Sequence, residues 1–365
     1  MSGNRKLNIL IVAFAFPPNK RVGAMRAGYW YRNLTTSLDC EISVITGQED
    51  AGGNRIHVVP KSGNSWMTRF IADDGVIWKT NIKDYIEQNE VSKPDLVIIT
   101  GGPFMHFSLT PWFKKKFGCK VILDYRDPFA TNPGFNNGWL KSGIKRYFEK
   151  RFNRKADALV TVNTYCGKII EEFHSKPNSI IQNGFDESSK CEPSQVTLED
   201  SLSFSYAGKF YFHPEHMVSA MNESEVGLSY IGPDKNQLDT SGAYIKSLGF
   251  VDYSTAIEVI GSADVGVIQT YGHEFQSTTK IFDYVRCERA ILIISDDKIE
   301  EGSIHDELQN YPNVVWAKNN KASIIDAINQ LKASTYSSPP IGFADKYSRG
   351  YQLKNLVALI KELGL

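Results

Sequence analysis

Short apolar runs alternate with amphipathic stretches along this chain of 365 residues. The runs are rich in Val, Ile and Leu, which is typical of strands buried on both faces of a parallel sheet. The strands predicted in this way are residues 9–14, 42–46, 96–100, 121–124, 158–162, 204–207, 227–231, 265–269, 290–294 and 313–316. The helices predicted between them include residues 24–37, 80–89, 165–173, 254–261 and 321–333.

This alternation predicts an α/β fold with two doubly wound, Rossmann-like domains that face a central cleft. Residues 1–185 form the first domain and residues 186–344 the second, because the polar stretch 186–201 reads as a linker. The region 345–365 contains a helical pattern near residues 353–363, and we expect it to pack back on the first domain. The sequence has no internal repeat and no low-complexity tract.

Composition narrows the class of protein. With 42% hydrophobic residues, the chain is too apolar for global disorder. Its five cysteines are scattered and form no C-x-x-C pair, so neither a disulfide framework nor a zinc site is predicted, as fits a reducing cytoplasm. The apolar run that begins at Leu7 is too short to span a membrane, and no cleavage site follows it. We therefore expect a cytoplasmic protein.

The net charge is zero, but the two halves differ. Residues 1–185 hold 26 Lys and Arg against 16 Asp and Glu, whereas residues 186–365 hold 15 against 25. This asymmetry predicts that the first half meets an anionic partner. Nucleic acid is not favoured, because the sequence has no arginine-rich arm, helix-turn-helix signal or RNP-like aromatic motif.

The basic residues of the first half concentrate in residues 112–117 and 139–155. In the second of these stretches Ile144, Phe148 and Phe152 recur at helical spacing, which indicates a basic amphipathic helix suited to an anionic membrane surface. The alternative is a core-packed helix with a solvated basic face. The candidate residues for binding the acceptor or a membrane surface are Arg26, Trp112, Lys114, Lys115, Lys116, Lys145 and Arg146.

Residues 277–285 carry the pattern of a nucleotide-diphosphate site. Three hydroxyl residues, Ser277, Thr278 and Thr279, stand where side-chain oxygens cap a helix start, and the free N–H groups there favour a phosphate. Lys280 adds a positive charge in the first turn, and Asp283 can accept a hydrogen bond from a sugar hydroxyl. The alternative is an ordinary capped helix that packs its apolar side chains into the core.

Other candidate loops follow the predicted strands, because ligands of open parallel sheets bind beyond the carboxyl ends of the strands. Each loop is a weak signal alone, but together they predict one site. The loops are residues 16–26 with Gly23, Thr100-Gly101-Gly102-Pro103, Tyr125-Arg126-Asp127-Pro128 after Asp124, Tyr206-Ala207-Gly208-Lys209, and Gly249-Phe250-Val251.

In their order and spacing, these motifs resemble the glycosyltransferases of the GT-B fold, and most closely those of the retaining family 4. The resemblance covers nearly the whole chain. It also includes Ala156-Asp157-Ala158-Leu159-Val160-Thr161-Val162-Asn163, Ile181-Gln182-Asn183-Gly184-Phe185-Asp186 and Ser262-Ala263-Asp264-Val265-Gly266-Val267.

The resemblance implies roles for individual residues in binding a nucleotide-sugar donor. It implies that Lys209 binds the diphosphate, that the backbone of Val251 contacts the nucleobase and that Asp283 binds the ribose. The amides of residues 277–279 lie near the phosphates of the donor in this family, and Gly23 approaches them from the other domain. Arg126 and Asp127 fall where the family often has a His and an Asp beside the reacting sugar.

The chain departs from the family pattern at several of these positions. The family has two glutamates separated by seven residues, whereas here the first position is Phe275, Glu274 lies one place away, and Asp283 replaces the second glutamate. The second basic residue expected after Lys209 is Pro214, next to His213. These departures leave the donor-sugar contacts open and keep a weakened or inactive enzyme as an alternative.

The reaction implied is transfer of a sugar from a nucleotide-diphosphate sugar to a hydroxyl of a glycan or polyprenyl-diphosphate-linked glycan, with retention, in surface polysaccharide or glycoconjugate synthesis. Cations such as Lys209 and Lys280 would stabilise the leaving diphosphate. Asp127 is the candidate base, with Arg126 positioning it, although a local salt bridge between the two is the alternative. No cofactor or essential metal is expected, because the sequence has no Asp-x-Asp signature.

Two further alternatives remain open at this stage. The chain could be a sugar-nucleotide epimerase of the same fold, or a non-catalytic sugar-nucleotide-binding partner of another transferase. We expect a transferase to act at the inner face of the cytoplasmic membrane as a peripheral protein, and we expect no nucleic acid as a partner.

Overall fold

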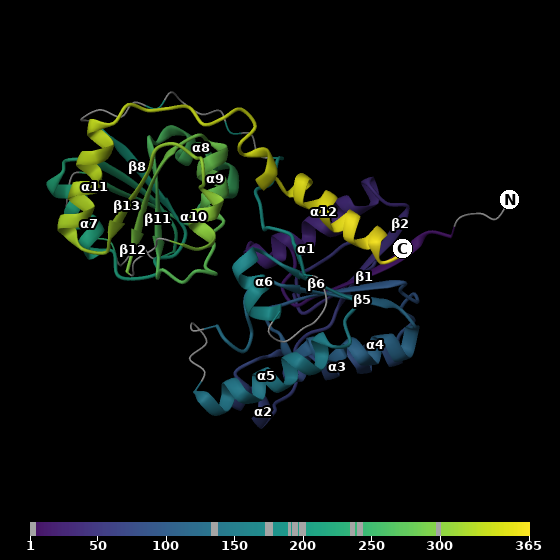
Figure 1. Ribbon diagram of the computed structural model, residues 1–365. Coiled ribbons are helices and arrows are strands. Elements are labelled where there is room, and N and C mark those ends of the chain that lie inside the picture. The colour runs from purple at the N-terminus through teal and green to yellow at the C-terminus, as the bar shows by residue number, and fades with distance from the viewer. Residues whose placement is uncertain are drawn as a thin grey trace. The chain divides into compact units, whose positions relative to one another are not determined.

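The computed structural model describes residues 5–132, 138–171, 178–188, 191, 196, 202–233, 238, 244–296 and 301–365. The chain divides into two compact units, of which the first comprises residues 1–183 and 351–365 and the second residues 184–350. Figure 1 shows that each unit consists of a sheet with helices on both faces.

The sheet of the first unit has seven parallel strands in the order β3-β2-β1-β4-β5-β6-β7. Its strands are β1 (Leu7–Ala13), β2 (Cys40–Thr46), β3 (Ile56–Val58), β4 (Leu96–Thr100), β5 (Lys120–Tyr125), β6 (Ala158–Thr161) and β7 (Asn178–Ile180). The central strands β1, β4 and β5 are almost wholly buried, which is why the sequence shows them as apolar runs.

Helices cover both faces of the first sheet. On one face α1 (Val22–Asn33) and α12 (Arg349–Glu362) pack on the strands, so that Leu356 and Ile360 share a core with Ile9 and Ile98. The other face lies above a larger helical layer in Figure 1. The remaining helices of this unit are η1 (Leu34–Thr36), α2 (Trp66–Ile71), α3 (Gly75–Gln88), η2 (Met105–Leu109), α4 (Thr110–Phe117), α5 (Trp139–Asn153) and α6 (Thr164–Glu171).

The second unit repeats this plan with six parallel strands in the order β10-β9-β8-β11-β12-β13. In Figure 1, α7 and α11 cover one face and α8, α9 and α10 the other. The strands are β8 (Ser203–Ala207), β9 (Gly227–Ile231), β10 (Ile245–Gly249), β11 (Val265–Thr270), β12 (Ala290–Ser295) and β13 (Val314–Lys318). The helices are α7 (Glu215–Glu223), α8 (Tyr253–Ser262), α9 (Lys280–Arg286), α10 (Ser303–Glu307), α11 (Lys321–Ala333) and η5 (Asp345–Tyr347).

The structure corrects the expectation that the chain forms no disulfide. Cys191 and Cys287 are paired, with their Cα atoms 5.9 Å apart and a sequence separation of 96. The scattered spacing did not predict this pair, because only the fold brings Cys191 back to the end of α9. The other cysteines, Cys40, Cys119 and Cys166, are free and buried.

The apolar run that begins at Leu7, which the sequence predicts to be too short for a membrane span, is strand β1. Within the described ranges, none of the helices combines the length and the apolarity needed to cross a bilayer.

Candidate functional site

Both sheets reverse their strand order at one point, between β1 and β4 in the first unit and between β8 and β11 in the second. The loops that leave the carboxyl ends of two such strands diverge, which opens a place for a ligand. In the first unit Arg126 and Asp127 follow the adjacent strand β5. In the second unit Lys209 follows β8 and Lys280 begins the helix after β11, so each unit has its own candidate site.

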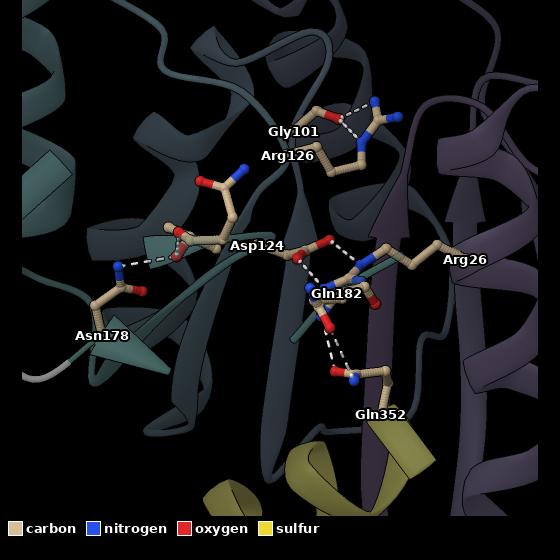
Figure 2. A network of polar contacts seen from close by, with 9 residues as sticks. Arg26, Gly101, Asp124, Arg126, Asn178, Gln182 and Gln352 are labelled. Atoms are coloured by element: carbon tan, nitrogen blue, oxygen red, sulfur yellow. Dashed lines mark hydrogen bonds and ion pairs between the residues drawn. The ribbon is translucent and has the colours of Figure 1, made fainter. Parts of the chain in front are cut away.

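In the first unit, Arg126 is the centre of the candidate site. Its Nε and Nη2 atoms donate hydrogen bonds of 3.2 and 2.7 Å to the carbonyl oxygen of Gly101, as Figure 2 shows. A Cβ atom at Gly23 would lie 2.2 Å from Nη1 of Arg126, and one at Gly102 would lie 2.6 Å from Nη2. The space beside Gly23 is therefore filled by the Arg126 guanidinium, although the resemblance assigned it to a ligand.

Asp127 lies next to Arg126 but does not pair with it. In the described part of the chain its carboxylate makes no hydrogen bond or ion pair, so the local salt bridge considered as an alternative is not formed. Desolvation raises the pKa of Asp127 above its usual value, and the Arg126 charge opposes that rise. Burial lowers the pKa of Arg126. The Asp127 side chain is exposed, and its carboxylate is therefore accessible to an incoming hydroxyl.

Arg26 is a buried structural residue, contrary to the prediction that it lies on an acceptor or membrane surface. It is 3% exposed, and its Nη2 and Nε atoms donate to the two carboxylate oxygens of Asp124 at 2.9 and 3.2 Å. Its Nη1 donates to the carbonyl oxygen of Gln182 at 2.8 Å (Figure 2). The reason is that Asp124, at the buried end of β5, requires a charge partner, and α1 supplies it.

Lys145 is also interior, with 2% exposure, and its ammonium lies 4.8 Å from the centre of the Phe129 ring. This corrects its prediction as a surface residue. The face that α5 turns inward is partly polar, because Glu149 and Asn153 are buried beside Lys145. Burial raises the pKa of Glu149 to about 7, while the amide of Ala130, which donates to its carboxylate at 3.3 Å, opposes that rise.

The other predicted surface residues are only partly available. Lys114 pairs with Asp157 at 2.7 Å, and Trp112 is half-buried with the Lys116 ammonium 5.6 Å from its ring centre. Lys115, Lys116 and Arg146 are exposed.

In the second unit, the end of β8, the loop that follows it and the start of α9 bring a lysine and two tyrosines together. The Lys280 ammonium lies 4.8 Å from the ring centre of Tyr206 and 5.2 Å from that of Tyr211. Gly208 leaves room for it, since a Cβ there would lie 3.0 Å from Cε of Lys280. Among the described residues no carboxylate pairs with Lys280, and burial lowers its pKa to about 8. A partly buried cation without a counter-ion is a candidate for binding an anion.

Asp283 and Tyr253 form the second contact of this site. The Tyr253 hydroxyl donates a hydrogen bond of 2.5 Å to the Asp283 carboxylate. Burial raises the pKa of Asp283 to about 6, while Tyr253, Arg286 and Arg349 oppose that rise. Tyr253 was not predicted, although its position two residues after Val251, at the start of a helix, was a usable signal.

The hydroxyl residues before α9 do not cap it as predicted. Thr279 makes no capping hydrogen bond through its side chain. Ser277 instead donates to both carboxylate oxygens of the buried Glu307, at 2.7 and 2.9 Å. Thr278 is buried, and Glu274 is exposed with its carbonyl oxygen accepting from the amide of Ser303 at 2.7 Å. Glu307 was missed because it lies 30 residues from Ser277 in sequence.

The remaining predicted donor residues flank this cluster. Lys209 is exposed, and its carbonyl oxygen accepts a hydrogen bond of 2.8 Å from the hydroxyl of Tyr206. Val251 is half-buried. Gln269, near the end of β11, is fully buried and accepts from the amide of Tyr211 at 3.1 Å, whereas its side-chain nitrogen has no partner among the described residues.

Metal ligands are not clustered in the described ranges, where no group of three or more His, Cys, Asp or Glu residues could hold an ion. That the reaction needs no metal or cofactor stays a prediction.

The sequence and the structure were compared with known protein families and solved structures. Residues 32–189 match the model of Glycosyltransferase Family 4. No curated protein sequence matches the chain. The N-terminal domain of trehalose-6-phosphate phosphatase from Candida albicans is similar in structure, with a TM-score of 0.68, 10% identity, and 100% of this chain and 99% of that chain covered.

Two further solved structures have a similar fold. UGT89C1 of Arabidopsis thaliana, complexed with UDP-L-rhamnose, has a TM-score of 0.62 at 10% identity, over 99% of this chain and 100% of that chain. A putative UDP-N-acetylglucosamine 2-epimerase from Listeria monocytogenes has a TM-score of 0.57 at 11% identity, over 98% of each chain. At these identities the similarity shows the fold.

The fold is that of the GT-B glycosyltransferases, and the family match over residues 32–189 supports a glycosyltransferase. The motifs resemble glycosyltransferase family 4, and residues 32–189, which are less than half of the chain, match the model of that family.

Proposed function

We propose that this protein transfers a sugar from a nucleotide-diphosphate sugar to a hydroxyl of a glycan or lipid-linked glycan. One observation carries the proposal. At the point where the second sheet reverses its strand order, Lys280 lies between two tyrosine rings without a carboxylate partner among the described residues. A diphosphate is an anion that fits this position, and it is the group that carries the charge when the sugar leaves.

The residues around Lys280 suit the rest of such a donor. Asp283 would accept hydrogen bonds from the ribose hydroxyls in exchange for the one that it now receives from Tyr253. The backbone at Val251 would contact the nucleobase, and Lys209, which is exposed after β8, would meet the diphosphate. Gln269 has a buried amide nitrogen without a partner among the residues that the structure describes, and this nitrogen would donate to a ligand oxygen.

The proposed reaction breaks the bond between the anomeric carbon and the diphosphate oxygen and forms a bond to the acceptor oxygen. The electron pair of the broken bond stays on the diphosphate, which the lysines stabilise. Asp127 takes the proton of the acceptor hydroxyl, and its raised pKa suits it to that role. Arg126, which is fixed by its hydrogen bond to the carbonyl oxygen of Gly101, positions the neighbouring Asp127. Retention of configuration is proposed from the resemblance to family 4.

The acceptor is proposed to be a glycan linked to polyprenyl diphosphate, and the pathway to be surface polysaccharide or glycoconjugate synthesis. The support is the charge of the first half of the chain, in which Lys and Arg exceed Asp and Glu by 26 to 16 over residues 1–185. We propose that the protein works as a peripheral protein at the cytoplasmic face of the membrane, where such acceptors are anionic.

The similar epimerase structure supports a second candidate, a sugar-nucleotide epimerase. The bond between Ser277 and Glu307 and the departure at Phe275 support a third, a non-catalytic partner that binds the nucleotide sugar. The test is release of nucleoside diphosphate from a panel of nucleotide sugars, with and without membrane extract as the acceptor source. We expect release that depends on the extract, whereas conversion of the sugar without extract would identify an epimerase, and binding without turnover a non-catalytic partner.

Donor binding should depend on pH with a maximum between two limits. Below about pH 6 Asp283 is protonated and loses its charge, and above about pH 8 Lys280 is neutral. We therefore expect the affinity for the nucleotide sugar to rise through pH 6 and to fall above pH 8, measured by titration calorimetry. Lys280→Arg should remove the fall on the alkaline side, because arginine keeps its charge. An affinity that stays flat from pH 7 to pH 9 in the native protein would contradict the role of Lys280.

Lys209→Ala should lower the turnover of sugar transfer by about 10²–10³-fold, because one charged contact to the leaving diphosphate is lost. The fold should be unchanged, since the Lys209 side chain is exposed and only its carbonyl oxygen is bonded. Lys318→Ala is the matched control, because Lys318 is an exposed lysine at the end of β13. Equal turnover in the two variants would remove Lys209 from the donor site.

A further inference from the structure

A groove of about 620 Å³ opens between α2 and the start of α5 in the first unit. Helix α2 lies beside α5 in Figure 1. The groove is lined by Asn64, Ser65, Trp66, Arg69, Phe70 and Lys141. No carboxylate is among these lining residues, whereas both of the charged ones are cations. The groove therefore has the charge of an anion site and aromatic walls.

The two cations of the groove are not compensated. Within the part of the chain that the structure describes, neither Arg69 nor Lys141 makes a hydrogen bond or an ion pair. Nearby, Lys61 illustrates the ordinary case, since it pairs with Asp74 at 2.9 Å. Two unpaired cations at one groove repel each other, and an anion placed between them would remove that cost.

Exposed apolar side chains lie at the groove or next to it in sequence: Trp66 lines it, and Trp139 and Leu140 directly precede its residue Lys141. Trp66 is 75% exposed, Trp139 87% and Leu140 50%. Trp66 contacts Phe70 with ring centres 6.3 Å apart, and so it is held at the edge of the groove. Such a cluster of exposed tryptophans marks a surface that meets another phase or molecule.

The outer side of α5 extends this surface. Trp139, Gly143 and Tyr147 follow one another at i, i+4 spacing and are all exposed. Further along the same side, the exposed residues are basic, namely Arg146, Lys150 and Arg154. Glu149, the acidic residue of this helix, is buried. The exposed side of α5 is therefore aromatic at its start and positive along the rest.

We propose that this surface, made of Trp66, Arg69, Trp139, Leu140 and Lys141 and called here the α2–α5 face, docks on a bilayer that contains anionic phospholipid. A headgroup phosphate enters the groove between Arg69 and Lys141, and the tryptophans and Leu140 enter the headgroup region. Tryptophan favours that region, and basic side chains are attracted by the negative lipid surface. The proposal deepens the proposed function, since a lipid-linked acceptor would be met at this surface.

The α2–α5 face differs from the basic surface that the sequence predicted. Figure 1 shows α4, with Lys115 and Lys116, and the start of α5 at opposite ends of the helical layer. Lys145, also predicted, is buried, and Lys114 is paired with Asp157. The groove and the exposed tryptophans therefore place the contact at one end of this layer.

The experiment is co-sedimentation of the full chain with vesicles, without any nucleotide sugar. One set of vesicles is pure phosphatidylcholine and the other contains about a third phosphatidylglycerol. We expect binding to the second set. We expect Arg69→Ala with Lys141→Ala to weaken it about 30-fold, from about 1 kcal/mol for each cation near an anionic surface. The matched control, Lys115→Ala with Lys116→Ala on α4, should bind as the native protein does.

A second measurement follows the tryptophans. The emission of the native protein should shift to shorter wavelength on binding the anionic vesicles, and Trp66→Phe with Trp139→Phe should remove most of that shift while the chain still sediments with the vesicles. Arg69, Trp66 and Trp139 are exposed and Lys141 is half-buried without a hydrogen bond or ion pair among the described residues, so we expect the fold to be kept.

Three results would overturn the proposal: equal binding to pure phosphatidylcholine, an equal loss in the α4 control, or binding of inorganic phosphate by a protein that sediments with neither set of vesicles. The last would mean a small-anion site. Because the assay contains no donor, its failure is distinct from a failure of sugar transfer.

Discussion

Asp127→Asn should lower the turnover of sugar transfer by about 10²–10⁴-fold, the range that a general base contributes. The amide cannot take the proton of the acceptor hydroxyl. The fold and the affinity for the nucleotide sugar should be unchanged, because the Asp127 side chain is exposed and makes no hydrogen bond or ion pair among the described residues. The measurement is turnover at saturating donor and acceptor, with the dissociation constant of the donor determined in parallel.

Asp84→Asn is the matched control for this variant. Asp84 is an exposed aspartate on α3, and its replacement should leave turnover at the native level. If Asp127→Asn kept native turnover, the base would have to be another group and Asp127 would lose its role. If it lost donor affinity in the same proportion as turnover, the residue would act in binding.

Asp124→Ala should lower the free energy of unfolding of the first unit by about 3–5 kcal/mol, because it leaves the Arg26 guanidinium buried without its charge partner. Arg26 is 3% exposed and Asp124 is not exposed at all, so water cannot replace the lost contact. Urea unfolding followed by hydrogen exchange of the β1 and β4 amides reports on this unit alone.

The control for Asp124 is Glu41→Ala. Glu41 pairs with Arg55 at 2.6 Å, but both side chains are about two-fifths exposed, and such pairs contribute about 1 kcal/mol or less. If Asp124→Ala lowered the free energy of unfolding by less than Glu41→Ala does, the Arg26–Asp124 pair would not be what stabilises the first unit. Replacing both partners with apolar residues should cost less than Asp124→Ala, because no buried charge is left unpaired.

The central strands could be predicted from sequence because their environment is uniform. β4 and β9 were predicted with the bounds that the structure shows, residues 96–100 and 227–231. The short edge strands β3, β7 and β10 were missed, because they are largely half-buried and their residues do not form apolar runs. An edge strand has a neighbouring strand on one side only and is less buried. Its sequence therefore lacks the continuous apolar run that marks a central strand.

The positions of the site loops could also be predicted, since a parallel sheet fixes where its strand ends lie. The partners of the side chains could not. Arg26 meets Asp124 from 98 residues away, and Ser277 meets Glu307 from 30 residues away. The amphipathic pattern predicts an exposed Lys145, yet the packing buries it on the same helix as the buried Glu149. Such pairing is decided by tertiary packing rather than by local spacing.

The central claim is that the second unit binds a nucleotide-diphosphate sugar at Lys280. The most direct test is the thermal stability of the native protein and of Lys280→Ala against UDP-, GDP-, ADP-, TDP- and CMP-sugars. Ligand that binds only the folded state raises stability as its concentration exceeds the dissociation constant. We predict that sugars of one nucleobase stabilise the native protein and that Lys280→Ala loses most of this effect. No stabilisation by any of them, or an equal effect in the variant, would contradict the claim.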